Sequence, residues 1–182
     1  MNLLTLLLPL VIIFTGNPYS IEFGNAAGRT NNWVILSDNV MGGMSEASVD
    51  YSKASVTLKG FVSMQNRGGF VSLKSGWGKM NLAAFKTVKI TFRSTTQVYA
   101  FTLENSRRWY EPAYKHNFSA AKANTWETVY LKLDDFTEER IGTPTGNKAG
   151  NAVLENIIRI GIATNEKREG PFQLEIESVT FL

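Results

Sequence analysis

The chain has 182 residues, of which 43% are hydrophobic and 19% are charged. This composition predicts one globular domain with enough apolar residues to form its own core. The absence of cysteine excludes disulfides, thiolate metal sites and a cysteine nucleophile. The net charge of +3 comes from scattered lysines and arginines rather than from a basic stripe, so we expect no nucleic-acid partner.

The first 20 residues differ in composition from the rest. Residues 3–14 are apolar except for Thr5 and Pro9. This run is too short for a membrane-spanning helix, which needs about 20 residues, and it has the length of a secretory signal core. We therefore expect residues 1–20 to be a signal peptide, cleaved after Ser20, of an exported periplasmic, secreted or envelope protein. The alternative is an uncleaved segment that holds the protein near a membrane. Residues 21–182 are expected to form a single domain.

Beyond Tyr19 the apolar and polar residues alternate with period two, which predicts strands with one buried face. The clearest runs are residues 88–92, 99–103, 129–133, 158–162 and 172–176, with further alternation over 56–64 and 71–73. Many short strands with Gly- and Asn-rich turns and no alternating helices predict an all-β antiparallel sandwich.

Three local features refine this pattern. The parity of the apolar positions changes between Ile176 and Val179, which predicts a β-bulge near Glu177 and Ser178. Residues 143–151 are rich in Gly, Asn, Pro and Thr and are interpreted as a long surface loop. Helical signals are limited to about one turn each at residues 81–85 and 152–156.

Two polar stretches contain paired glycines: Asp38-Asn39-Val40-Met41-Gly42-Gly43-Met44-Ser45 and Asn66-Arg67-Gly68-Gly69. Paired glycines favour tight turns and close backbone approach, and Asp38 and Ser45 can cap backbone donors in such turns. Met41 and Met44 are expected to fill the core beneath the first turn. We interpret one set of residues as structural, with direct ligand contact as the alternative: Asp38, Met41, Gly42, Gly43, Ser45, Asn66, Gly68 and Gly69.

These stretches, followed by Trp126-Glu127-Thr128-Val129, Asp135-Phe136 and Glu169-Gly170-Pro171-Phe172-Gln173-Leu174-Glu175-Ile176, resemble the complex I intermediate-associated protein 30 family. The resemblance covers about residues 21–182. It implies a galactose-binding-like jelly-roll sandwich. It also implies a role like that of the family's mitochondrial members, which are assembly chaperones for the membrane arm of respiratory complex I. Bacterial members carry the same domain, and the apolar leader favours a bacterial-type envelope protein. Ile141 interrupts the family's Arg-Gly ending at Arg140 and Gly142, so no family role is carried over to Arg140.

Few residues offer catalytic chemistry. His116 is the single histidine, it has no accompanying Gly-x-Ser-x-Gly motif, and it cannot form a multi-histidine metal site. Asp134-Asp135 and Glu138-Glu139 are adjacent pairs, whose side chains point to opposite faces of a strand. We favour a solvated turn there over paired carboxylates or a calcium site at Asp134 and Asp135. No nucleotide-binding loop is present. We therefore predict a protein that is not an enzyme and has no metal or cofactor.

The most site-like stretch is residues 107–116, which combines three aromatic side chains, three cations and the histidine. Aromatic faces beside hydrogen-bonding groups suit sugar rings or an anchored peptide. We predict a binding site formed by Arg93, Tyr99, Arg107, Trp109, Tyr110, Tyr114 and His116. Arg93 and Tyr99 are expected to line one sheet face from neighbouring strands. The alternative is an amphipathic hairpin that covers the edge of the sandwich.

The leading functional hypothesis is an assembly or chaperone-like module that binds an unfolded or partly assembled respiratory or envelope protein through one sheet face. The family resemblance and the missing catalytic constellation motivate it. The alternative is a jelly-roll carbohydrate-binding module with a glycan ligand, motivated by Trp109, Tyr110 and Tyr114.

Overall fold

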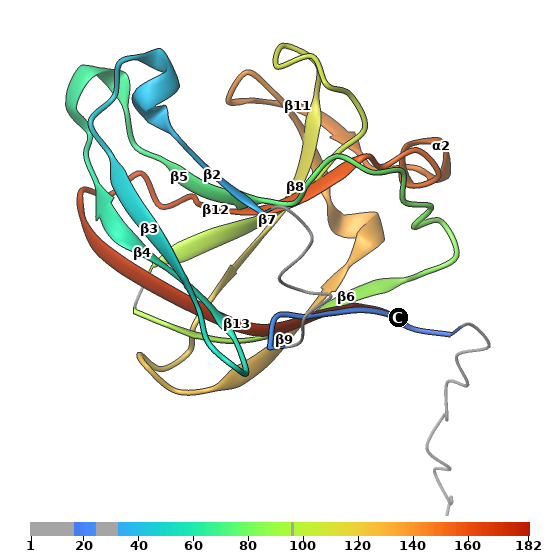
Figure 1. Cartoon of the computed structure of the whole chain (residues 1–182). Helices are drawn as coiled ribbons and strands as arrows, with labels where there is room; N and C mark the ends of the chain where they lie inside the picture. Colours follow the sequence, from blue (N-terminus) through green and yellow to red (C-terminus); the bar gives the residue numbers. More distant parts are fainter. Residues whose placement is uncertain (1–16, 25–32, 96) are drawn as a thin grey trace, which may run out of the picture.

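The computed structural model describes residues 17–24, 33–95 and 97–182, whose strands form two antiparallel sheets (Figure 1). The six-stranded sheet contains, in spatial order, β3 (Glu46–Tyr51), β4 (Val56–Val62), β13 (Gly170–Phe181), β6 (Thr87–Ser94) and β9 (Glu127–Lys132), and β1 (Tyr19–Glu22) pairs with β13. The seven-stranded sheet contains β11 (Thr143–Lys148), β10 (Thr137–Arg140), β8 (Ala113–Ser119), β7 (Val98–Glu104), β12 (Arg159–Thr164), β5 (Val71–Lys74) and β2 (Val34–Ser37). The predicted all-β antiparallel sandwich is confirmed.

Within the residues that the structure describes, the helical elements are single turns in the connections between strands. They are η1 (Asp38–Met41), η2 (Gln65–Arg67), η3 (Leu133–Asp135) and α2 (Asn151–Leu154). No helix in the described part of the chain is long and apolar enough to cross a membrane. The predicted apolar leader at residues 3–14 lies outside the described residues. The first described strand, β1, begins at Tyr19, two residues before the predicted start of the domain.

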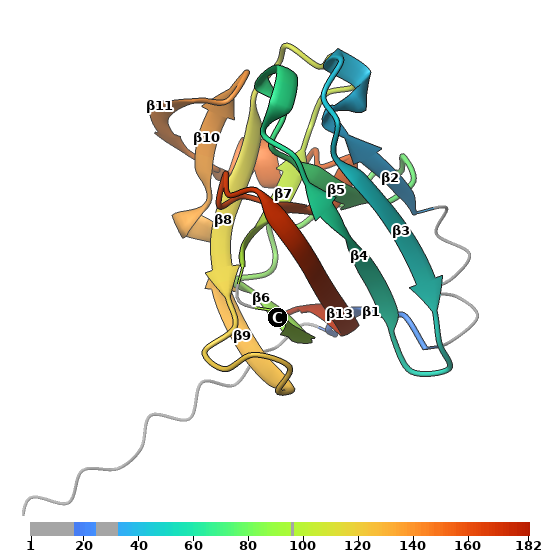
Figure 2. The same cartoon turned by 90° about the vertical axis from the view of Figure 1, so that its left-hand side faces the viewer.

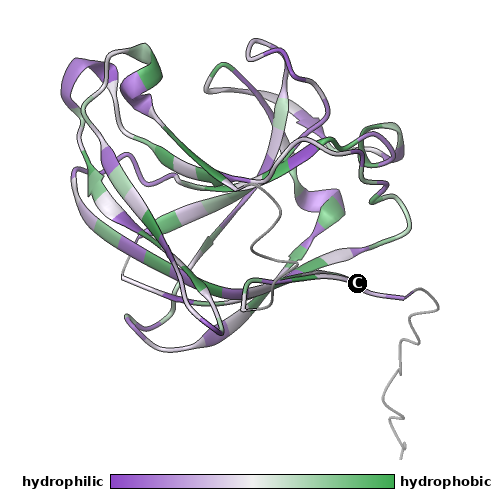
Figure 3. Cartoon of the chain, viewed as in Figure 1, coloured by the Kyte–Doolittle hydropathy of each residue, from purple (hydrophilic) through white to green (hydrophobic). Residues whose placement is uncertain are grey.

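The core lies between the two sheets, which pack face to face (Figure 2). Ile90 and Phe92 of β6 and Phe101 and Leu103 of β7 are fully buried there, as the period-two alternation predicts. Hydrophobic and hydrophilic residues alternate along the strands (Figure 3). Because the apolar side chains point inward, the alternate polar ones cover the outer face of each sheet.

The predicted β-bulge in the last strand is confirmed. The register between β13 and β6 shifts between Ile176 and Ser178. Before the shift β13 pairs with β4 up to Ile176, and after it the strand pairs with β1 from Ser178 to Phe181. The bulge therefore lies where β13 changes its neighbour on one edge, and it turns Val179 and Phe181 into the core.

The prediction of a surface loop over residues 143–151 is wrong. Residues Thr143–Lys148 form β11, which pairs with β10, and α2 follows. All six residues of β11 are exposed, so this edge strand has no apolar face and its sequence shows no alternation. The hairpin turn is Ile141-Gly142, and both residues have positive φ, 49° and 74°, as two-residue hairpin turns of type I′ require. A β-branched residue is strained in this conformation, at a cost of about 1–3 kcal/mol.

The side chain of Asp38 joins the two glycine-rich stretches. Its buried carboxylate accepts hydrogen bonds from the Ser45 N–H (2.9 Å), the Ser45 hydroxyl (2.5 Å) and the backbone N–H groups of Gly69 (2.6 Å) and Phe70 (3.2 Å). The Ser45 hydroxyl in turn accepts from the Ser63 N–H. One ionised group therefore fixes the β2–β3 connection to the β4–β5 connection.

The glycines give this carboxylate its space. A Cβ atom at Gly43 would lie 2.3 Å from Oδ1 of Asp38, and one at Gly68 would lie 2.6 Å from Oδ2. Gly42 and Gly69 have φ values of 87° and 124°, which L side chains rarely adopt. The Asn66 side chain completes the junction by donating to the Gly42 carbonyl at 3.0 Å.

Burial raises the pKa of the Asp38 carboxyl, but the hydrogen bonds from Ser45, Gly69 and Phe70 outweigh it and hold the pKa below its usual value. The carboxylate is therefore ionised at neutral pH, and its hydrogen bonds are charge-assisted.

We expect Asp38→Asn to lower the free energy of unfolding by about 3 kcal/mol, because an amide NH₂ would face backbone donors in a buried site. Urea denaturation at pH 7 measures this. The matched control is Asp50→Asn, which removes an exposed ion pair with Lys59 (2.7 Å) and should cost less than about 1 kcal/mol. Equal losses in the two variants would contradict the assignment.

Comparison of the wild type with Asp38→Asn also gives a prediction about pH. Since the pKa of Asp38 is lower in the folded chain than in the unfolded one, its stabilisation is complete above the unfolded value of about 4 and is lost as pH falls through the folded value. The stability difference between wild type and Asp38→Asn should therefore shrink below about pH 4. Urea titrations from pH 3 to 7 test this, and a constant difference would argue against it.

Candidate functional site

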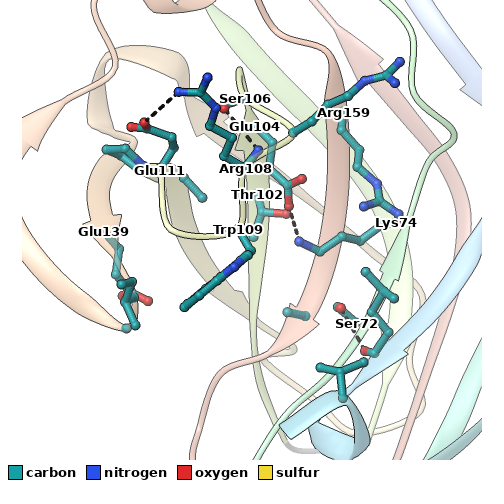
Figure 4. Close-up of a pocket in the computed structure, with 18 of the residues that line it drawn as sticks. Ser72, Lys74, Thr102, Glu104, Ser106, Arg108, Trp109, Glu111, Glu139 and Arg159 are labelled. Atoms are coloured by element: carbon teal, nitrogen blue, oxygen red, sulfur yellow. Dashed lines mark hydrogen bonds and ion pairs between the residues drawn. The ribbon is translucent and has the colours of Figure 1, made fainter.

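A cleft of about 740 Å³ opens on the face of the seven-stranded sheet that points away from the core (Figure 4). Its floor consists of outward-facing residues of β5, β7 and β12. Its walls come from η1 on one side and, on the other, from the β7–β8 connection and the β10–β11 turn. Figure 1 shows η1 (blue) and the β10–β11 hairpin (orange) at opposite edges of this sheet.

The floor is polar and is organised around Gly161 of β12. Gly161 pairs with Lys74 of β5 on one side and Thr102 of β7 on the other. A Cβ atom at Gly161 would lie 2.9 Å from both Lys74 Cγ and Thr102 Oγ1. Because that side chain is missing, Lys74 extends across β12 and forms an ion pair with Glu104 of β7 (Figure 4). The Thr102 hydroxyl beside it is buried and has no hydrogen-bond partner within the described residues.

One end of the cleft contains two arginines against Trp77. The Arg159 guanidinium carbon lies 4.3 Å from the Trp77 ring centroid and that of Arg107 lies 5.4 Å from it. Arg159 is 8% exposed, and its Nε donates to the Ser75 carbonyl at 3.0 Å. Burial lowers the pKa of Arg159, opposed by the charge of Glu104, but a guanidinium retains its proton at any physiological pH.

The rim of the cleft is apolar and open to solvent. Val40 and Met41 of η1 are 72% and 66% exposed, and Trp109 and Ile141 on the other side are 79% and 64% exposed. The prediction that Met41 and Met44 fill the core is wrong, since Met44 is also 55% exposed. The physical reason is the Asp38 junction, which turns η1 so that its apolar side chains point outward while Asp38 points inward.

Two of the predicted binding residues, Arg107 and Trp109, line this cleft. Tyr110 lies next to them and packs edge-on against the Trp109 ring, with ring centroids 6.0 Å apart. Its backbone carbonyl accepts a hydrogen bond from Arg140 at 3.1 Å. The β7–β8 connection therefore contributes to the site as one unit.

The prediction that Arg93 and Tyr99 line one sheet face is wrong, because the chain crosses from one sheet to the other between them. Arg93 lies on the outer face of β6, where it pairs with Glu175 (2.6 Å) and covers Trp126. Tyr99 is buried in the core, and its hydroxyl donates to the Gln173 carbonyl at 3.2 Å. Burial raises its pKa to about 12.

Tyr114 and His116, both on β8, also lie outside the cleft. The Tyr114 hydroxyl donates to Glu138 at 2.9 Å, and burial together with this carboxylate raises the pKa of Tyr114 to about 12. The His116 ring packs against Phe136 at 5.5 Å and lines a separate hollow of about 210 Å³ with Asp135 and Thr137. Residues 17–24, 33–95 and 97–182 contain no group of three or more His, Asp or Glu side chains that could hold a metal ion.

Among the cleft residues that sequence reasoning missed are Lys74, Trp77, Thr102, Glu104 and Arg159. All but Trp77 occupy the polar positions of strands that the alternation identified. The alternation therefore places them on an outer face, but it contains no signal for which outer face is hollow.

Several solved structures share the fold. The family 11 carbohydrate-binding module of a cellulosomal cellulase of Clostridium thermocellum superimposes with a TM-score of 0.66 and 11% identity, covering 91% of this chain and 94% of that one. The same module in complex with a β-1,3-1,4-mixed-linked tetrasaccharide gives 0.57 and 11%, with coverage of 83% and 88%. A mutant of a family 29 carbohydrate-binding module, CBM29-2, gives 0.52 and 14%, with 92% of both chains covered. At these identities the likeness shows the fold alone, a jelly-roll sandwich of the galactose-binding-like type.

Comparison with curated protein sequences gives no match. The family model for complex I intermediate-associated protein 30 matches residues 21–176. This range includes both glycine-rich stretches, the Asp38 junction that binds them together and the whole cleft. The chain therefore belongs to the complex I intermediate-associated protein 30 family.

Proposed function

We propose that the protein is a non-catalytic assembly factor that holds an extended segment of a partner protein in the cleft of the seven-stranded sheet. The observation that carries the proposal is the apolar rim, in which Val40, Met41, Trp109 and Ile141 are all more than 60% exposed. Clustered exposed apolar side chains at a concave surface are typical of binding sites.

The chemistry of the rim favours a protein over a sugar. Met41, Val40 and Ile141 are aliphatic, and flexible methionine adapts to varied apolar partners. Sugar rings commonly stack on flat aromatic faces, and of the two tryptophans in the cleft Trp77 is covered by guanidinium groups. Only Trp109 presents a broadly open ring. A peptide offers apolar side chains for the rim and backbone polar groups for the Lys74, Thr102 and Glu104 floor.

A photo-crosslinking amino acid tests the surface directly. We expect a crosslinker in place of Ile141, at the rim, to form adducts with respiratory or envelope proteins in a membrane extract. The same crosslinker in place of Tyr130, which is 62% exposed on the six-stranded sheet, should form none. Trp109→Ala should abolish the adducts at position 141, since large aromatic side chains dominate such interfaces. Equal adducts from both positions would overturn the proposal.

Ile141 gives a second test, because its positive φ destabilises the folded protein. Asn tolerates positive φ far better than isoleucine, so Ile141→Asn should raise the free energy of unfolding by about 1 kcal/mol. It should also weaken partner binding through the loss of an apolar rim residue. Thermal unfolding measures the first effect, and the adduct yield from a crosslinker in place of Val40, on the opposite side of the rim, measures the second. An Ile141→Asn variant that is more stable and binds equally well would remove Ile141 from the site.

A carbohydrate-binding function is the second candidate, favoured by the open Trp109 ring and by the carbohydrate-binding modules that share the fold. Under this alternative, a glycan array gives binding that Trp109→Ala lowers at least tenfold, or about 1.4 kcal/mol, and Tyr130→Ala leaves unchanged. A blank array, or binding that survives Trp109→Ala, would exclude it.

We also propose that the protein is exported, with the apolar run at residues 3–14 as its signal. Tyr19 and Ser20 pair with Phe181 and Thr180 in β13, and the Tyr19 ring stacks on Phe181 at 5.9 Å. Cleavage after Ser20 would remove half of β1, so we expect the mature protein to begin at or before Tyr19. Mass spectrometry of the mature N-terminus tests this, and an intact Met1 in the membrane fraction would indicate the anchored alternative.

A further inference from the structure

We propose that Arg107, Trp77 and Arg159 form a carboxylate-binding subsite at one end of the cleft, so that the segment held there carries an acidic side chain or a free C-terminus. This inference rests on the proposed function, because it specifies the chemistry of the segment that occupies the same cleft. The evidence for it is the set of charged side chains in the cleft rather than the apolar rim.

Arg159 is the central observation. Its side chain is more than nine-tenths buried and lines the cleft, and a buried charge without a counter-ion is costly. The contacts that hold it are the Ser75 carbonyl and the Trp77 ring. No carboxylate of the described chain forms an ion pair with it, because Glu104, whose charge it senses, pairs with Lys74.

Arg107 adds a second positive charge at the same place. Its guanidinium lies against the same Trp77 ring as that of Arg159, and it likewise forms no ion pair with a described carboxylate. Cation–π contacts hold such groups within about 6 Å of a ring without neutralising them. Two guanidinium groups that form no ion pair with a described carboxylate therefore lie against one ring at this end of the cleft.

The other charged residues that line the cleft are paired. Lys74 pairs with Glu104, Glu139 with Lys115, and Arg108 with Glu111 at 4.0 Å. The charge left over at the Trp77 end is positive. The planar fork of a guanidinium matches a carboxylate in a bidentate geometry, so a carboxylate is the group that this end of the cleft is built to accept.

Titration of the protein with sodium acetate tests the subsite itself. The reporters are the arginine Nε–H signals in ¹⁵N NMR, and sodium chloride keeps the ionic strength constant. The Arg159 Nε–H, which donates to the Ser75 carbonyl, and that of Arg107 should shift saturably. Arg107→Gln should weaken the acetate effect on Arg159 at least threefold. The control Arg168→Gln, in a surface pair with Glu166 (3.3 Å), should leave it unchanged. Shifts no larger than those caused by chloride, or equal shifts at Arg168, would overturn the subsite.

Three decapeptides of alternating leucine and serine then connect the subsite to the proposed function. One has a central aspartate and an amidated end, one a central asparagine and an amidated end, and one a central asparagine and a free C-terminus. We expect one of the two acidic peptides to bind about tenfold more tightly than the neutral one, which also identifies the source of the carboxylate. Arg107→Gln should remove this preference, whereas Arg168→Gln should retain it.

The outcomes separate the two proposals. If all three peptides bind equally, the carboxylate subsite is wrong and the peptide-binding cleft stands. If none binds while acetate shifts the Arg159 signal, the subsite stands and the peptide-binding function is wrong. Tight binding of the neutral peptide alone would also overturn the subsite.

Discussion

The geometry of the cleft depends on the ionised carboxylate of Asp38. Four donors from two chain segments converge on it, two from Ser45 and one each from Gly69 and Phe70. Gly43 and Gly68 are required because any side chain there would occupy the space of the carboxylate oxygens. The junction in turn determines which way η1 faces. The polar residues of the sequence signature thus decide where its apolar residues, Val40 and Met41, form one wall of the cleft.

Several departures from the rules of stable folding coincide on this one face. The rim exposes large apolar side chains, and Ile141 adopts a conformation that isoleucine disfavours. Among the described residues, the buried Thr102 hydroxyl has no hydrogen-bond partner and the buried Arg159 has no ion-pair partner. Each has a free-energy cost, and each has a different chemical origin. Departures of this kind concentrate at functional sites in proteins that otherwise obey local rules. Their coincidence supports the cleft as a site independently of any relative.

The sandwich, the principal strands and the bulge in β13 could be predicted from the sequence because all three determine whether the apolar residues occupy odd or even positions. Val179 and Phe181 could reach the core only if one residue was added after Ile176, so parity located the bulge. β11 shows no such pattern, because both of its faces are exposed. Arg107 and Trp109 lie together beside Tyr110, as the sequence grouped them, whereas Arg93 and Tyr99 lie on different sheets. Alternation shows which residues of a strand face the core, but not the sheet to which the strand belongs. The cleft depends on the order of the strands in the seven-stranded sheet.

The pairing of β1 with β13 has a consequence for the direction in which the cleft faces. Tyr19 belongs to β1 of the six-stranded sheet, which lies opposite the seven-stranded sheet (Figure 1). The cleft lies on the outer face of the seven-stranded sheet. If residues before Tyr19 were attached to a surface, that surface would therefore lie on the side of the six-stranded sheet, opposite the cleft. The mouth of the cleft would then point away from that surface, toward proteins arriving from solution or extending outward from neighbouring complexes.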